Sequence, residues 1–175
     1  FSWSGFGHAP TEQDIVDELA IGRGILGRHR AIVGDDCWIY ITLGNHEERA
    51  ERITALNPAF RRYVAQHLPA DMGLEEFKIK YFEWGGHINY LGCILTHGTW
   101  YSRALFASGQ AAKRMIMLYG GSGVSGHTHR RSLIAYSDAK TTHTWIEAGC
   151  LARLDQSWRR GPTDWQWGFV LGVVY

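Results

Sequence analysis

Three histidine-bearing turns, each placed directly after a short strand-like run, constrain the fold of this chain more than any other feature. They read Gly44-Asn45-His46-Glu47, Thr96-His97-Gly98 and Gly126-His127-Thr128-His129. Chain that leaves the end of a buried strand lines the crevice where α/β folds place their binding sites. We therefore expect polar side chains from the three turns to converge, although they lie far apart in the sequence.

Helical and strand-like segments alternate along the chain. A helix is expected to start with Thr11 as its N-cap, and Gly22, Gly24 and Gly27 weaken it toward its end. The nearly continuous apolar run over residues 37–43 predicts a strand buried on both faces. Further helices are expected over 48–56, 58–67 and 102–119, and strands over 78–83, 87–90, 93–96, 133–136, 142–147 and 167–174. This order indicates a single α/β domain over residues 1–175, with two packed sheets and helices outside them.

Amino-acid composition and net charge limit the cellular location and the binding partners that we expect for this protein. The chain has 175 residues, 45% of them hydrophobic, and a net charge of +1. So small a charge creates no global field that would recruit nucleic acid or an anionic membrane. No apolar run is long enough to span a bilayer, and the opening residues lack the regions of a signal peptide. We therefore expect a cytoplasmic protein with no membrane partner, whose three widely spaced cysteines are reduced core thiols.

The residue types in the three turns suit a transition-metal site. Imidazole nitrogen with amide or carboxylate oxygen favours Zn, Mn or Fe over Ca or Mg. In extended backbone, His127 and His129 would project to the same side, so that one loop offers two nitrogens to neighbouring ions. Each motif alone has an ordinary structural explanation: His-Gly is common in turns, and Asn-His-Glu can cap a helix. The three together, in this order, are harder to explain as structural coincidences.

In this order, Gly-Asn-His-Glu, His-Gly and Gly-His-Thr-His resemble the third, fourth and fifth signature blocks of the calcineurin-like metallophosphoesterases. The segments Glu147-Ala-Gly-Cys150-Leu and 164–169 are also similar to the tail of phage-type members, which is a weaker match. The resemblance spans about residues 38–169. It implies a four-layer α/β/β/α sandwich and hydrolysis of phosphoesters by a dinuclear metal centre.

Carried over by position, the resemblance implies a role for each motif residue. Asn45, His97 and His127 would be ligands of one metal ion, and His129 would be a ligand of the other. His46 would be the catalytic histidine that faces the leaving group. The implied cofactors are two divalent ions (Mn, Zn or Fe), and the implied activity is that of a phosphodiesterase or a nuclease-like enzyme.

The chain departs from the family pattern in its first part. The family has an Asp-x-His block and a Gly-Asp block before Gly-Asn-His, and this sequence contains no Asp-x-His. Asp35 and Asp36 precede the strand that leads to Asn45, which would leave them roughly 20 Å from the site at about 3.3 Å per residue. We therefore expect an N-terminally incomplete sandwich that offers three ligands to one ion but only His129 to the other.

Two rival interpretations stay open. With part of the ligand set missing, the chain could be a catalytically incomplete binding or structural module that keeps a vestigial metal site. Metallopeptidases of the JAMM type use His-x-His-Pro with a later Ser and Asp at fixed spacing. Ser137 fits that pattern, but Arg130 stands in place of the Pro and Lys140 in place of the Asp.

The substrate is the least constrained feature. Arg130 directly follows His129 and could contact a phosphate group, although surface arginines more often form only weak ion pairs. Trp100 lies close to His97 and could stack on a nucleobase. These two residues are the candidates for substrate binding, and a phosphoester, with nucleic acid as one option, is the expected partner.

Overall fold

The computed structural model describes residues 12–45, 67–83, 85–98, 109–154 and 164–173, and it has a mixed α/β fold with two sheets. The chain divides into two compact units, Phe1–Trp84 and Gly85–Tyr175. The expectation of a single domain over residues 1–175 stays a prediction. None of the described helices is long and apolar enough to cross a membrane.

The first unit combines a long helix with a pair of parallel strands. Helix α1 spans Glu12–Val33, strand β1 spans Ile39–Thr42 and strand β2 spans Ile79–Phe82. The two strands pair in parallel, with Ile39 opposite Ile79. Residues 67–71, which are helical, and a series of turns lead into β2. The helices expected over 48–67 lie almost entirely outside the described residues.

Helix α1 continues past the glycines that were expected to weaken it. Gly27 allows close packing, since a Cβ there would meet the Phe77 ring at 3.1 Å. Arg30 in the last turn is buried and donates to the carbonyl oxygens of Phe77 and Gly34 at 2.7 and 2.6 Å. It also donates to Cys37 and Lys78 at 2.7 and 3.0 Å. These bonds satisfy carbonyls at the helix end and in the neighbouring turns, so the helix ends at a fixed place.

The burial expected for the first strand is wrong. All four residues of β1 are half-buried, and the flanking Cys37 and Trp38 are exposed, Trp38 by 71%. Among the described residues β1 pairs with β2 and with no other strand. The apolar run therefore predicted the strand but not its burial, and Cys37 is not a core thiol.

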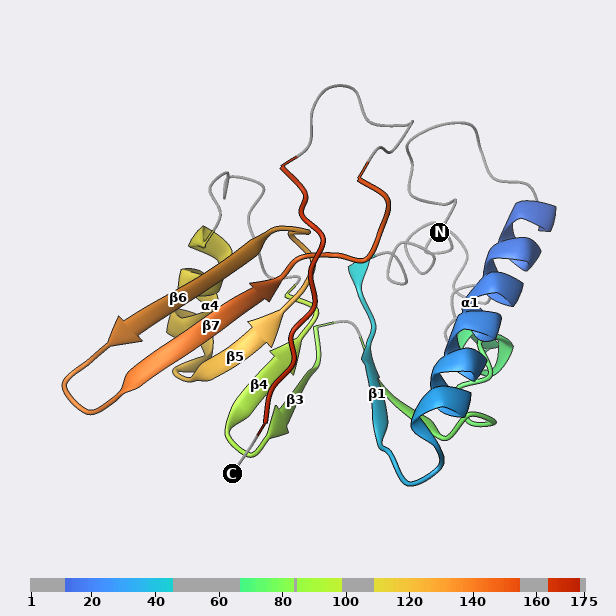
Figure 1. Cartoon of the computed structure of the whole chain (residues 1–175), viewed down its shortest axis with the longest axis horizontal. Coiled ribbons are helices and arrows are strands. Elements are labelled where there is room, and N and C mark those ends of the chain that lie inside the picture. Colours follow the sequence, from blue (N-terminus) through green and yellow to red (C-terminus); the bar gives the residue numbers. More distant parts are fainter. Residues whose placement is uncertain (1–11, 46–66, 84, 99–108, 155–163, 174–175) are drawn as a thin grey trace, which may run out of the picture. The chain divides into compact units, whose positions relative to one another are not determined.

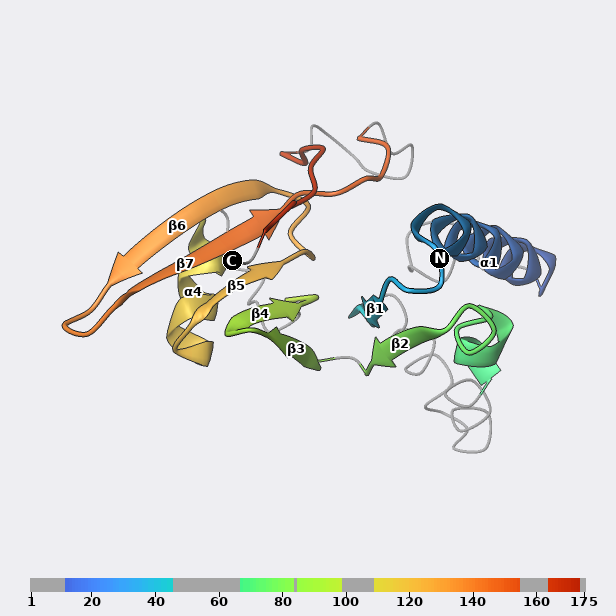
Figure 2. The same ribbon diagram turned by 60° about the horizontal axis from the view of Figure 1, so that its bottom comes forward.

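The second unit is a five-stranded mixed sheet with one helix packed on it (Figures 1 and 2). Its strands are β3 (His87–Tyr90), β4 (Cys93–Thr96), β5 (Ser122–Ser125), β6 (Arg131–Ser137) and β7 (Thr142–Ala148), in the order β3-β4-β5-β7-β6. The three central strands β4, β5 and β7 run parallel, whereas β3 and β6 are antiparallel edges. The carboxyl ends of the central strands therefore share one edge of the sheet.

Helix α4 (Gln110–Tyr119) supplies the core of this unit. Its buried face carries Ala112, Met115 and Ile116, which pack with Ile94 and with Trp145, whose exposure is 0%. Gly120 ends the helix in the left-handed conformation, donating to the carbonyl of Ile116. This end matches the expected helix at residue 119. The described helix begins only at Gln110, because Gly109 is left-handed with a φ of 84°, and residues 102–108 lie outside the described part of the chain.

Strand predictions in this unit are mostly confirmed, but β5 was not among the expected strands and the last expected strand is wrong. The strands expected over 87–90, 93–96, 133–136 and 142–147 correspond to β3, β4, β6 and β7. The strand expected over 167–174 is absent from the described residues 167–173, where Trp167 makes a single bridge to Cys150. Apolar residues here, such as Phe169 and Leu171, remain largely exposed, so no burial holds them in a ladder.

Candidate functional site

His97 and His127 meet at the carboxyl edge of the second unit's sheet. His97 directly follows β4, and His127 lies two residues beyond the end of β5. These strands are adjacent and parallel, with Thr96 paired to Ser125, so the chain leaves both at the same edge. Nδ1 of His127 lies 3.2 Å from Nε2 of His97, and the ring centroids are 5.1 Å apart. The convergence expected for these two turns is confirmed.

This nitrogen pair has the spacing of two ligands on one ion. Two nitrogens that each bind a zinc ion at about 2.1 Å lie roughly 3.0–3.4 Å apart for angles of about 90–109° at the metal. The observed 3.2 Å falls inside that range. It also suits an N–H···N hydrogen bond between two neutral imidazoles. The 3.2 Å distance therefore fits either a shared ion or a direct hydrogen bond between the two rings.

His129 has a different environment from the other two histidines. Its ring lies edge-on to Trp165, with ring centroids 4.2 Å apart, and its backbone carbonyl accepts from Gln166 N at 2.8 Å. The extended backbone expected for His127-x-His129 is wrong, because both histidines have positive φ, 65° and 60°. Left-handed backbone costs a non-glycine residue on the order of 1–2 kcal/mol, and it persists where the surroundings impose it.

Several hydrogen bonds impose this shape on the loop. Thr128 N donates to Gly126 O at 2.8 Å, and Gly149 N donates to Arg130 O at 2.8 Å. The Thr128 hydroxyl donates to Oε1 of Glu147 at 2.8 Å. The loop that carries both histidines is therefore tied to β7 and to the residue that follows it.

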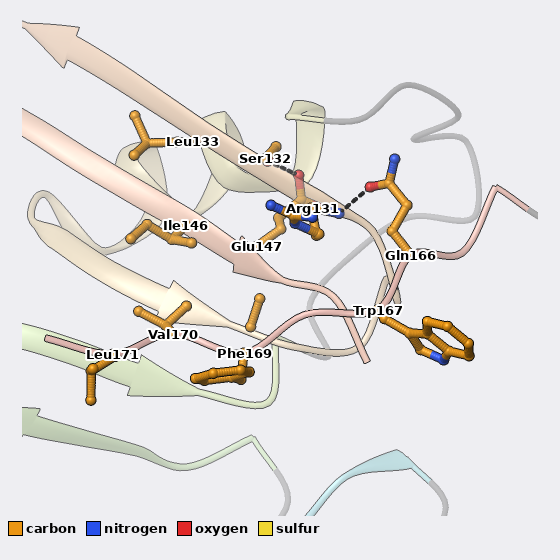
Figure 3. A pocket seen from close by; sticks show the side chains of 11 residues that line it. Arg131, Ser132, Leu133, Ile146, Glu147, Gln166, Trp167, Phe169, Val170 and Leu171 are labelled. Atoms are coloured by element: carbon orange, nitrogen blue, oxygen red, sulfur yellow. Dashed lines mark hydrogen bonds between the residues drawn. The ribbon is translucent and has the colours of Figure 1, made fainter. Parts of the chain in front are cut away.

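Glu147 is a residue of the site that the sequence analysis did not single out. It lies in β7, its exposure is 1%, and its Oε2 accepts from Gly109 N at 2.7 Å and from the Ser132 hydroxyl. Figure 3 shows the carboxylate facing Ser132 on the neighbouring strand β6. The available signal was alternation: Glu147 is two residues from Trp145, so a carboxylate falls on the buried face of the predicted strand.

Arg130 is engaged by the protein itself. Its Nε lies 3.0 Å from Oδ2 of Asp164, and the arginine side chain is only 17% exposed. Next to it, Arg131 N donates to Oε1 of Gln166 at 2.7 Å, and this bond is drawn in Figure 3. The segment that carries Asp164, Trp165 and Gln166 thus lies against the histidine loop.

The groove in Figure 3 is distinct from the histidine pair. It has a volume of about 760 Å³ and lies between strands β6 and β7 and the segment 166–171. Its lining is mainly apolar, with Leu133, Ile146 and Phe169, and it includes none of the predicted histidine ligands. One residue of its lining, Glu147, also contacts the histidine loop through Thr128.

The remaining predicted site residues lie in the first unit or outside the described residues. Asn45 directly follows Gly44 at the end of the β1 segment in the first unit and is half-buried. His46 and Trp100 lie outside the described residues. At the other end of β1, Asp35 lies 2.6 Å from Nζ of Lys78, and this hydrogen bond lowers the pKa of the Asp35 carboxyl. Asp35 is thus committed to a surface ion pair.

The geometry of β6 disagrees with the metallopeptidase interpretation. Ser137 ends this seven-residue strand, whereas His129 lies just before its start, so the two are separated by about 20 Å of strand. The Ser137 hydroxyl lies 2.8 Å from that of Thr142 in the hairpin between β6 and β7. A ligand set built on His129 and Ser137 therefore cannot form on this hairpin.

The described residues contain a two-nitrogen pair and not a complete metal site. Within them, no group of three or more His, Cys, Asp or Glu side chains gathers closely enough to hold an ion. Comparison of the chain with protein-family models, curated proteins and solved structures finds no match. The order of the motifs and the geometry of the histidine loop are the features of this chain that bear on its function.

Proposed function

We propose that this chain is part of a divalent-metal-dependent phosphoester hydrolase of the calcineurin-like type, with the four-layer α/β/β/α fold. The observation that carries the proposal is the His97–His127 contact at 3.2 Å, between turns that follow adjacent parallel strands. The order of the three motifs supports the same chemistry.

The proposed roles follow from the ligand chemistry. His97 and His127, with Asn45, hold one ion, and His129 contributes to the second. When bound, two divalent ions (Mn, Zn or Fe) acidify water and neutralise the charge that develops on a phosphoryl group. His46 donates a proton to the departing oxygen.

A phosphodiester, including nucleic acid, is the substrate class that we propose. Arg130 stands one residue after His129, and the Asp164 carboxylate fixes its direction. It therefore orients a phosphate oxygen as one fixed donor rather than as a mobile cation. Trp100 provides a stacking surface for a base.

The test measures metal content and hydrolysis of bis-p-nitrophenyl phosphate in Mn²⁺, on this chain and on one extended at its N-terminus. We expect the substitutions His97→Ala and His127→Ala to weaken metal binding by at least about 100-fold, since each removes a direct ligand. The matched control is His143→Ala, because His143 contacts Asp138 in the β6–β7 hairpin, outside the motifs. His46→Ala should lower turnover far more than metal binding.

Other outcomes separate the alternatives. Metal binding with no hydrolysis by either chain would favour the binding module with a vestigial site. Metal affinity that is the same in the wild type, His97→Ala and His127→Ala would overturn the proposal.

A further inference from the structure

The loop between β5 and β6 presents its two histidines through an unusual backbone. His127 and His129 both have positive φ, and Thr128 between them does not. The carbonyls of His129 and Arg130 are fixed by Gln166 N and Gly149 N, both at 2.8 Å. On the preceding side, the Thr128 hydroxyl bonds the side chain of Glu147. The direction of each imidazole therefore depends on where Thr128 is held.

The hydrogen bonds of Glu147 hold Thr128 in place. Its carboxylate is almost fully buried, and such a charge is tolerated only when donors surround it. One oxygen accepts from Thr128, and the other accepts from Gly109 N and from Ser132. Gly109 is the N-cap of α4, so the positive end of the helix dipole also favours the carboxylate. Glu147 therefore joins the histidine loop to the helix and sheet that form the core of the unit.

Gly109 must be a glycine for this contact to form. Its φ is 84°, and a Cβ there would lie 2.8 Å from Cδ1 of Ile134. The backbone can thus approach the carboxylate closely, at 2.7 Å, while Ile134 packs beside it. Both oxygens of Glu147 are occupied by protein donors, which makes this residue an anchor and not a metal ligand.

We propose that Glu147 is a positioning residue of the metal site. It acts through Thr128, keeping His127 and His129 in the left-handed conformation from which they present their ring nitrogens. This inference rests on the proposed function, but it concerns a residue outside the three histidine turns and predicts an effect on metal affinity without direct contact.

The experiment compares two substitutions, each of which removes one hydroxyl group that donates a hydrogen bond to the Glu147 carboxylate. Thr128→Val removes the donor in the histidine loop with little change of shape, and Ser132→Ala removes the donor on β6. Zn²⁺ affinity is measured by competition with a chromophoric chelator, alongside the thermal midpoint of each metal-free variant. We expect Thr128→Val to weaken Zn²⁺ binding 10- to 100-fold, Ser132→Ala to change it less than about threefold, and Thr128→Ser to restore it.

Two results would overturn the inference in distinguishable ways. If the wild type binds Zn²⁺ and Thr128→Val binds it equally well, the Thr128–Glu147 contact is merely structural, while the proposed function stands. If the wild type binds no Zn²⁺, the proposed function fails for this chain. The imidazole ¹⁵N resonances of the metal-free proteins then test the positioning role of Glu147. Signals of His127 and His129 that shift in Thr128→Val but not in Ser132→Ala would retain the positioning role, and unchanged signals would overturn it.

Discussion

Gly123 is the residue whose side chain, or lack of one, most directly decides the packing of the second unit. It lies in the central strand β5, where a Cβ would come within 2.4 Å of Ile94 O and 2.7 Å of the Trp145 ring. A neighbouring strand and the largest core side chain thus both occupy the space that any other residue would need. The sequence pattern does not predict this close packing, because Ser-Gly-Val-Ser has neither strong alternation nor a high strand propensity.

We predict that Gly123→Ala destabilises the protein by about 3 kcal/mol, since both neighbours are rigid and the overpacked core must shift. The matched control is Gly121→Ala, where the added Cβ would meet Ile94 Cδ1 at an ordinary 3.5 Å. The control should change the free energy of unfolding by less than about 1 kcal/mol. Urea denaturation followed by tryptophan fluorescence measures both, and equal stability of the two variants would contradict the packing described for Trp145.

The contact between His97 and His127 depends on more than the positions of the two residues in the sequence. The sequence predicts that His97 and His127 follow strands, and this much is confirmed. The 3.2 Å contact between them depends on β4 and β5 being neighbours, although helix α4 separates the two strands in the chain. Glu147 joins the same site from β7, which is adjacent to β5 although it follows β6 in sequence.

In the hairpin between β6 and β7, the carboxylate of Asp138 sets the turn. Asp138 follows β6, and its Oδ1 accepts from the backbone N–H groups of Lys140 and Thr141 at 2.8 and 2.9 Å. Its Oδ2 lies 3.5 Å from Nε2 of His143. The Lys140 and Thr141 N–H groups, in that order, with His143 as a further contribution, lower the pKa of Asp138 below its ordinary value of 3.8.

This lowered pKa predicts how the hairpin responds to acid. Since the folded form has the lower pKa, Asp138 stabilises the hairpin fully above pH 4 or so, and the contribution is lost as the pH falls through the folded value. In an NMR titration, the amide signals of Lys140 and Thr141 should shift with a midpoint below 3.8. Asp138→Asn keeps an acceptor oxygen but cannot titrate in this range, so its amide signals should stay constant. An Asp138 that titrates at or above 3.8 would contradict the turn geometry.

At the scale of the whole molecule, the two units differ in how much apolar surface they bury. The second unit has a connected core of Ile94, Ala112, Met115, Ile116 and Trp145. Among the described residues of the first unit, the buried hydrophobic side chains are Leu68, Leu74 and Ile79. Because burial of apolar surface is the main favourable term in folding, we expect the two units to differ in local stability.

Hydrogen exchange read by mass spectrometry measures this difference. Amides of β5, β7 and α4 should exchange at least about tenfold more slowly than those of β1 and β2, after correction for intrinsic rates. The edge strands β3 and β6 provide the internal comparison, with protection between these limits. Equal protection of β1 and β7 would show that the first unit has a core beyond its described residues.

The sequence by itself determined where most strands and helices lie and that histidines follow two of the central strands, because both depend on local periodicity and turn chemistry. It did not determine the half-burial of β1 or the exposure of residues 169–171, because burial depends on which elements cover a strand. The left-handed backbone of His127 and His129 was likewise decided by tertiary contacts from Glu147, Gly149 and Gln166. A strained loop persists only when distant parts of the chain hold it, and those partners have no fixed spacing in sequence.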